Sequence, residues 1–267
     1  MVVGTPVNRL SFECNRLSSG YPALLRRVVS LGEEVPSRAG NTREVVGFTL
    51  SLGDPVHCVV GREGSSREFM DLEIAMLLAG TFDRELVERV TPRAAELITT
   101  KTAYGPRVWH QLREVETELK NDPTSRRGLV VVGDRHDLSG VHDPTTADQF
   151  GHEIPCTVSW QFLIRNGMID AIVCMRSWDL VWGLTYDVPC FVAVQTALAR
   201  ALDVEVGCYL HLAGSAHVYE RHWATPTWDN WERGELEIPW LADSVAETQS
   251  NARAALDEMR TAAWLRA

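Results

Sequence analysis

The chain has 267 residues, of which 45% are hydrophobic and 23% are charged, and its formal net charge is −10 at pH 7. This acidity argues against a general nucleic-acid surface, so an anionic ligand would have to be bound by local arginines. No apolar run is long enough to span a membrane, and the six cysteines form no CxxC pair, which favours free thiols in the reducing cytoplasm.

The first hundred residues are predicted to form one helix, then two strands, then two helices. The polar loop 36–43 places glycine near Arg38, an arrangement that can bind phosphate. Glu73 lies beside the apolar stripe of a helix that Gly80 ends. It is either a residue at the solvent edge or a partly buried carboxylate with a raised pKa. The predicted helices are 21–31, 67–79 and 84–97, and the predicted strands are 45–52 and 56–60.

The middle of the chain contains two adjacent arginines before a predicted strand. Tyr104-Gly105-Pro106 indicates a turn, and a helix is predicted from 108 to 120. Arg126 and Arg127 precede the apolar run 128–132. Within a strand the two side chains would point in opposite directions, one to the subunit's own surface and one elsewhere. The alternative is a solvated strand start. A long polar loop, 134–153, then leads to Cys156.

A predicted hairpin carries Cys156 at one end. Residues 158–164 alternate in polarity, Arg165-Asn166-Gly167 indicates a tight turn, and 168–175 return as a second strand. The hairpin would bring Cys156 close to Arg176 and Ser177, where positive charge can stabilise a thiolate. The alternative is an inert cysteine at a strand end. The candidates for the buried face are Val158, Trp160 and Phe162.

The last third is predicted to contain a helix over 189–202, a strand over 206–212, and helices over 217–231 and 243–267. Asp187 comes just before the first of these helices, where aspartate is a common N-cap. His217 follows a Gly-Ser turn, so the start of a helix would present it.

The order of these motifs resembles the thymidylate synthase superfamily, from about Arg38 to about Ile238. The resemblance implies an α+β fold, with one domain over residues 1–267 and a large mixed sheet. Helices would cover one face of that sheet, and the twin subunit of a homodimer would cover the other. The matching residues are Arg38, Glu73 and Gly80, Tyr104-Gly105, Ser125-Arg126-Arg127, Pro155-Cys156, Arg176-Ser177-Trp178-Asp179, Gly183 with Asp187, and Gly214-Ser215-Ala216-His217-Val218-Tyr219.

The resemblance also implies a role for each residue. Cys156 would add to C6 of a pyrimidine nucleotide, and C5 would then attack the one-carbon unit of 5,10-methylenetetrahydrofolate, with no metal required. Glu73 would order water and relay protons, Tyr104 would assist removal of the C5 proton, and Asp187 would contact the base. The implied binding residues are Arg38, Arg176 and Ser177 for the 5′-phosphate, Arg126 and Arg127 of the neighbouring subunit in trans, His217 and Tyr219 for the 3′-hydroxyl, and Asp179, Glu73 and Gly183 for the folate.

Asp187 departs from the members that methylate dUMP, which carry asparagine at this position. The amide of asparagine fits uracil, whereas cytosine presents a donor at N4 and an acceptor at N3. An aspartate can accept from N4–H and, when protonated, donate to N3. Asp187 therefore predicts a cytosine nucleotide, dCMP or CMP. Thr157 stands where methylating relatives usually have histidine, which fits a site more open to water.

The sequence motifs around Arg176 and His217 most resemble those of the deoxycytidylate hydroxymethylase branch. There, water traps an exocyclic methylene and gives 5-hydroxymethyl-dCMP and tetrahydrofolate. Three alternatives stay open. A C5-methylase, or a thymidylate synthase acting on dUMP, would release dihydrofolate. A branch member serving modified nucleosides would prefer CMP over dCMP. A non-catalytic nucleotide-binding protein would have an unreactive Cys156.

Overall fold

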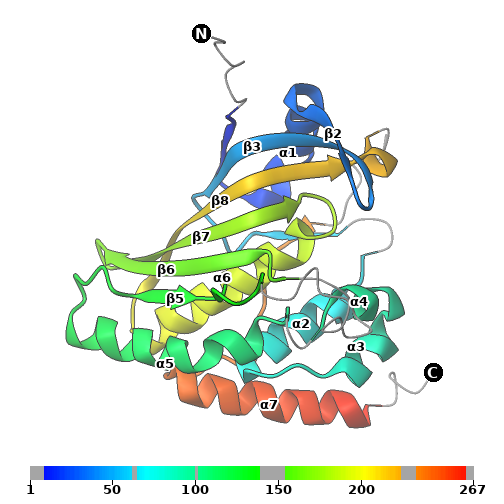
Figure 1. Ribbon diagram of the computed structural model, residues 1–267. Helices are drawn as coiled ribbons and strands as arrows, with labels where there is room; N and C mark the ends of the chain where they lie inside the picture. Colours follow the sequence, from blue (N-terminus) through cyan, green and yellow to red (C-terminus); the bar gives the residue numbers. More distant parts are fainter. Residues whose placement is uncertain (1–8, 62–64, 100–101, 139–153, 224–232, 263–267) are drawn as a thin grey trace.

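A mixed seven-stranded sheet forms the centre of the computed structural model, which describes residues 9–61, 65–99, 102–138, 154–223 and 233–262. Its strand order is β1-β3-β8-β7-β6-β5, and β2 pairs with β3 (Figure 1). The pairs β1–β3 and β7–β8 are parallel, and the others are antiparallel. The predicted α+β architecture with a large mixed sheet is thereby confirmed.

The elements of the described residues have the following bounds. The strands are β1 (Ser11–Cys14), β2 (Glu33–Ser37), β3 (Gly40–Leu52), β4 (Val59–Val60), β5 (Leu129–Val131), β6 (Thr157–Arg165), β7 (Met168–Asp179), β8 (Glu205–Tyr219) and β9 (Arg233–Gly234). The helices are α1 (Leu17–Leu31), α2 (Arg67–Ala79), α3 (Arg84–Val90), α4 (Pro92–Leu97), α5 (Gly105–Asn121), α6 (Leu184–Ala201) and α7 (Val245–Thr261), with a 3-10 turn at Glu220–His222.

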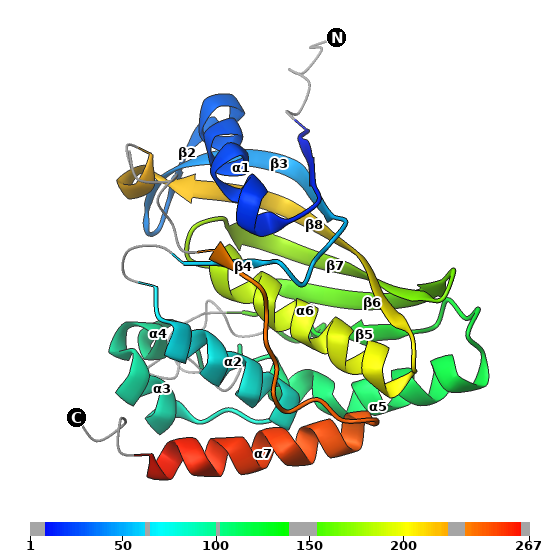
Figure 2. The ribbon, with the colours of Figure 1, turned by 180° about the vertical axis from the view of Figure 1, so that it is seen from behind.

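Helices cover one face of the sheet. Helix α6 lies across β7 and β8, and α1 packs on β3 and β8 (Figure 2). Helices α2, α5 and α7 pack further out, with α2 in contact with α6 and α7. Because α6 lies between the sheet and this outer layer, almost all of its side chains are buried. None of the helices in these ranges is long and apolar enough to cross a membrane.

Three neighbouring strands change their buried face at one level of the sheet. On β7 every second residue is buried up to Met175, and the next buried residue, Trp178, comes three positions later. On β8 the same change occurs between Ala213 and Ala216. On β3, opposite β8, they step from Phe48 to Val45 across Gly47, whose φ is +71°. Such irregularities re-aim side chains. Beyond this level, polar residues alternate with the core positions at the end of the sheet.

Several local predictions are confirmed. Helix α2 spans the predicted residues and ends at Gly80, which has a left-handed φ of 70°. The β6–β7 hairpin turns at Asn166 (φ 53°) and Gly167 (φ 76°), as the Asn-Gly signal predicts. The predicted helix 84–97 is interrupted at Thr91, because Pro92 begins a new helix there. In the 56–60 segment, only Val59–Val60 forms a strand.

Other local predictions are wrong. His217 does not begin a helix, because β8 continues to Tyr219 and is paired with β3 and β7 throughout. Only a 3-10 turn follows, and residues 224–231 lie outside the described ranges. The loop predicted at 36–43 is instead the tip of the β2–β3 hairpin. Tyr104-Gly105-Pro106 is the first turn of α5, where proline is accepted.

Val158 is also wrongly assigned to the buried face of the hairpin. It is 43% exposed, whereas Trp160 and Phe162 are buried as predicted. The β6–β7 register shifts between Thr157 and Ser159. An extra residue at this point breaks the alternation. Thr157 therefore takes the inward position in place of Val158.

Candidate active site

A pocket of about 340 Å³ opens where α2, α6 and the start of α5 meet the ends of β6 and β7. One wall is apolar and includes Phe82, Ala94, Ile98 and Trp182, which the sequence analysis did not select. The predicted site residues that line the pocket are Glu73, Tyr104, Cys156, Ser177, Asp179, Gly183 and Asp187. Those that do not line it are Arg38, Arg126, Arg127, Arg176, His217 and Tyr219.

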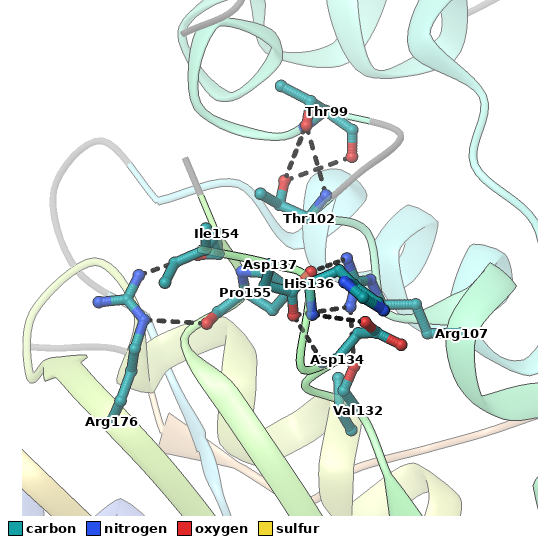
Figure 3. A network of polar contacts seen from close by, with 10 residues as sticks. All are labelled: Thr99, Thr102, Arg107, Val132, Asp134, His136, Asp137, Ile154, Pro155 and Arg176. Atoms are coloured by element: carbon teal, nitrogen blue, oxygen red, sulfur yellow. Dashed lines mark hydrogen bonds and ion pairs between the residues drawn. The ribbon is translucent and has the colours of Figure 1, made fainter. Parts of the chain in front are cut away.

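Cys156 stands directly before β6, with its side chain half-buried at the pocket. The backbone N–H of Arg176 donates to the Cys156 carbonyl over 2.8 Å, so the hairpin brings the two together as predicted. The Arg176 guanidinium donates through Nε to the Pro155 carbonyl (3.0 Å) and through Nη2 to the Ile154 carbonyl (2.9 Å) (Figure 3). Arg176 therefore braces the backbone that leads into the candidate nucleophile.

A second arginine, missed by the sequence analysis, fixes the start of the long loop. Arg107 on α5 donates to both carboxylate oxygens of Asp137 (2.7 and 3.1 Å) and to the Val132 carbonyl (2.9 Å) (Figure 3). Burial would raise the pKa of Asp137, but hydrogen bonds from Arg107 and the Asp134 amide outweigh it and lower that pKa. The positive charge of Arg176 also lowers the Asp137 pKa, so Asp137 is near enough to Arg176 to be affected by its charge. Residues 139–153 of the loop lie outside the described ranges.

Asp187 is not an N-cap, which corrects the simplest interpretation of its position. Helix α6 begins at Leu184 after Gly183, and the Asp187 amide already donates to the Gly183 carbonyl over 2.8 Å. Asp187 therefore stands in the first turn and lines the pocket. A Cβ on Gly183 would come within 2.9 Å of Asp187 Oδ2 and 2.8 Å of the Asp179 carbonyl. Glycine at 183 thus leaves the space that the Asp187 carboxyl occupies.

The carboxyl groups of Glu73 and Asp187 both bind protons more tightly than usual. Burial raises the pKa of Glu73 to about 8, and the charge of Asp187 adds to the effect. Burial also raises the pKa of Asp187 to about 7. The indole N–H of Trp178 opposes this rise in the Asp187 pKa, and the negative charge of Asp179 adds to it. Near neutral pH the pocket therefore contains carboxyl groups that can donate as well as accept a hydrogen bond.

Replacing Glu73 with glutamine is expected to make stability less dependent on pH. The folded-state pKa of about 8 lies above the ordinary 4.5, so the stability contributed by this proton is present below pH 4.5 and lost as the pH rises through 8. At about 1.4 kcal/mol per pKa unit, the wild type should lose a few kcal/mol more than Glu73→Gln between pH 5 and pH 9. Urea unfolding at both pH values measures the difference.

The matched control for this prediction is Glu68→Gln on the same helix. Glu68 is exposed, and hydrogen bonds from the backbone and Ser66 lower its pKa, so its loss should not flatten the pH dependence. An equal decline with pH in the wild type and in Glu73→Gln would contradict the burial of this proton.

Tyr104 precedes α5, and its ring packs against two other aromatic rings. Its centroid lies 6.4 Å from that of Trp160, edge-on, and 5.7 Å from that of Phe191. Burial raises the pKa of Tyr104 well above its usual value, and the charges of Asp187 and Cys156 raise it further. Tyr104 is therefore a neutral phenol at the pH of the cell.

Asp179 and His217 lie opposite each other where β7 pairs with β8. Oδ1 of Asp179 accepts from the amides of Val181 (2.8 Å) and Trp182 (3.1 Å), which shapes the turn into α6. Burial lowers the pKa of His217, although the charges of Asp179 and Glu44 oppose this, so the imidazole is neutral at pH 7. The ring of Tyr219 stands edge-on to His217 at 5.2 Å. His217 and Tyr219 thus belong to the polar end of the sheet and lie outside the pocket lining.

The remaining arginines stand on opposite edges of the sheet. Arg38 is at the tip of the β2–β3 hairpin, where Arg221 donates to the Ala39 carbonyl over 3.3 Å. Arg126 and Arg127 precede β5 at the other edge, and both are exposed. Arg127 bonds Glu118 through Nε and Nη2, each at 2.8 Å. The strand predicted to contain both begins only at Leu129.

Comparison with known proteins gives a consistent result. Residues 91–259 match the model of a family described as thymidylate synthase. The deoxyuridylate hydroxymethyltransferase of Bacillus phage SP01 is 26% identical over 231 residues, which cover 78% of this chain and 58% of that protein. The thymidylate synthase of Staphylococcus haemolyticus is 29% identical over 112 residues, covering 42% of this chain and 32% of that protein. The chain therefore spans less than two thirds of the length of these relatives.

Proposed function

This chain belongs to the thymidylate synthase family, and we propose that it is a folate-dependent 5-hydroxymethyltransferase acting on a cytosine nucleotide, dCMP or CMP. The observation that carries the proposal is Asp187, which lines the same pocket as Cys156 and has a pKa raised to about 7. The cosubstrate would be 5,10-methylenetetrahydrofolate, bound against the apolar wall with Asp179, Glu73 and Gly183 nearby.

The proposed reaction begins when the Cys156 thiolate forms a bond to C6 of the base. The electron pair released at C5 attacks the one-carbon unit and forms a carbon–carbon bond. Loss of the C5 proton to water then forms an exocyclic methylene, as the bond to the folate nitrogen breaks and tetrahydrofolate leaves. A second water adds to the methylene, and the electrons return through the ring to expel Cys156. The products are the 5-hydroxymethyl nucleotide and tetrahydrofolate.

Asp187 fits cytosine because its carboxyl group can carry a proton at neutral pH. The protonated group would donate to N3 while its other oxygen accepts from N4–H. Donation to N3 also stabilises the charge that develops when Cys156 adds to C6. With the proton on the oxygen that faces N3, uracil, which presents N–H at N3 and a carbonyl at position 4, would meet the wrong partner at each atom.

The relative from phage SP01 favours one rival, because its name says that it acts on deoxyuridylate. A second rival is methylation, for which the thymidylate synthase of S. haemolyticus is a precedent by name. Both rivals use the same addition of Cys156 to C6. Only the base and the fate of the methylene distinguish them.

Product mass spectrometry tests the proposal and its rivals together. The purified protein receives methylenetetrahydrofolate and equal amounts of dCMP, CMP and dUMP. A hydroxymethyl mass gain on a cytosine nucleotide supports the proposal and identifies the sugar. A hydroxymethyl gain on dUMP alone would overturn the role of Asp187, and a methyl gain with dihydrofolate would overturn the trapping by water.

The positions of the arginines support a homodimer as the working unit. Arg38 and Arg176 would bind the 5′-phosphate together with Ser177, whereas Arg126 and Arg127 stand at the far edge of the same sheet. A homodimer packed sheet to sheet about a twofold axis would set residues of each subunit against its twin. Arg126 and Arg127 would then reach the partner's site, and His217 and Tyr219 would hold the 3′-hydroxyl.

The uncovered face of the sheet has the composition that such pairing needs. Figure 1 shows it without helices, and its apolar side chains are exposed: Val46 (46%), Leu129 (48%), Val131 (49%) and Val158 (43%). Large apolar side chains left exposed on an uncovered sheet face favour an interaction surface there. A second copy of the chain would bury it.

Mixing two inactive variants should restore activity if Arg126 acts in trans. Arg126→Ala and Cys156→Ala are each expected to be inactive. In a heterodimer, one site combines an intact Cys156 with the partner's intact Arg126. Random reassociation makes about half of the dimers mixed, which gives about a quarter of wild-type turnover. Mixing Arg176→Ala with Cys156→Ala is the control and should restore nothing, because those two residues serve the same site.

A further inference from the structure

Arg221 is an arginine beside the predicted sugar-binding residues that the proposed reaction leaves unused. It lies in the 3-10 turn that follows β8, two residues after Tyr219. Its guanidinium carbon stands over the ring of Tyr219, 4.1 Å from the ring centroid. A guanidinium at this distance from the face of an aromatic ring is attracted to it. Arg221 therefore covers one face of a ring that is predicted to lie at the sugar 3′-hydroxyl.

A second contact fixes Arg221 from the neighbouring hairpin. Its Nη1 atom donates to the Ala39 carbonyl, at the tip of the β2–β3 hairpin, over 3.3 Å. Strand β3 is antiparallel to β8, with Thr42 opposite Tyr219 (Figure 1). The hairpin tip and the turn after β8 therefore lie side by side. This hydrogen bond ties the Arg221 side chain to the backbone of another element and so helps to keep the guanidinium over the ring.

The Tyr219 ring in turn meets the imidazole of His217. The two ring centroids are 5.2 Å apart, and the ring planes are nearly perpendicular, at 89°. Burial lowers the pKa of His217, and the positive charge of Arg221 lowers it further. The negative charges of Asp179 and Glu44 oppose this effect. Arg221 is thus near enough to act on both rings, and it favours the neutral imidazole, which can accept a hydrogen bond from a hydroxyl group.

We propose that Arg221 is a positioning residue that holds the Tyr219 ring against His217, in the orientation that brings the Tyr219 hydroxyl to the sugar 3′-hydroxyl. The inference rests on the proposed function, because it needs a nucleotide whose sugar lies at these residues. Tyr219 is the last residue of β8, so the contacts of its ring, rather than a continuing strand, fix where its hydroxyl points. Arg221 takes no part in making or breaking bonds.

The test measures the dissociation constants of dCMP and of 2′,3′-dideoxycytidine monophosphate by isothermal titration calorimetry. The dideoxy nucleotide keeps the base and the phosphate but lacks the 3′-hydroxyl. Arg221→Met keeps an unbranched stem without the charge. It should bind dCMP about fivefold more weakly than the wild type does, and the dideoxy nucleotide within about twofold. Arg221→Lys keeps a cation over the ring and should bind dCMP within about twofold of wild type.

Arg43→Met is the matched control. Arg43 also stands over an aromatic ring, that of Trp223 at 5.1 Å, and it also donates to a backbone carbonyl, that of Gly32 at 3.4 Å. It lies opposite Val218, the neighbour of Tyr219 along β8, so it points to the other face of the sheet. Its loss should change neither dissociation constant by more than about twofold.

A double-mutant comparison shows whether the effect passes through the Tyr219 hydroxyl. In a Tyr219→Phe background, Arg221→Met should weaken dCMP binding no further, because the hydroxyl that Arg221 positions is absent. Four results would each overturn the inference: unchanged dCMP binding in Arg221→Met, equal losses for the two nucleotides, full additivity with Tyr219→Phe, or a wild type that binds both nucleotides equally. Binding needs no turnover. A wild type that shows the expected binding differences but forms no 5-hydroxymethyl product would therefore overturn the proposed function alone.

Discussion

Replacing Cys156 with alanine is expected to abolish turnover, with a loss of at least about 10⁴-fold, because Cys156 is the side chain proposed to form the bond to C6. Cys156 lines the pocket together with Tyr104 and Ser177. Without the thiolate, C5 never gains the electron pair that attacks the one-carbon unit. Product formation and tritium release from C5 should therefore disappear together, while the nucleotide still binds.

The measurement combines tritium release with mass spectrometry of the trapped covalent complex. Cys208→Ala is the matched control, because Cys208 is an exposed cysteine on β8 that does not line the pocket. It should retain both tritium release and the covalent complex. A covalent nucleotide complex on Cys156→Ala would mean that another side chain is the nucleophile and would contradict the proposed reaction at its first step.

Local patterns were sufficient to predict the half of the site that one hairpin builds. The alternation in β6 and β7 and the Asn166-Gly167 turn are encoded within a few residues. They bring Cys156 and Arg176 together without help from the rest of the fold. Helix α2 was equally predictable, because its apolar stripe and Gly80 are local signals.

The other features depend on contacts between distant segments. His217 continues a strand only because β8 is paired on both sides, with β3 and with β7. Thr157 faces inward because of a register shift that the alternation in the sequence does not reveal. The raised pKa of Glu73 needs the burial that packing supplies and the charge of Asp187 on another helix. Such effects arise from tertiary packing, which overrides local propensity.

Replacing Asp187 with asparagine is expected to exchange the base preference from cytosine to uracil. In the orientation that matches uracil, the amide donates to O4 and accepts from N3–H, which is the reverse of what cytosine needs. A buried polar mismatch of this kind predicts a loss of about 10² to 10³ in kcat/KM for dCMP, with a gain for dUMP. Steady-state kinetics with each nucleotide measures the exchange. Ser177→Ala is the matched control, because Ser177 lines the same pocket and is proposed to bind the 5′-phosphate that both nucleotides share, so its loss should affect both alike.

The pH dependence of kcat/KM distinguishes two possible roles of Asp187: donating a hydrogen bond to N3, or only shaping the pocket. If the protonated carboxyl donates to N3, kcat/KM for dCMP must fall as the pH rises through the Asp187 pKa of about 7, because the donor loses its proton. The asparagine variant has no such proton, so its activity on dUMP should lack this decline. Trp178→Phe removes the indole N–H that opposes the raised pKa, so the decline should move to higher pH. If the Asp187→Asn variant kept its preference for dCMP, other residues would have to recognise the base. Asp187 would then have only a structural role in the first turn of α6.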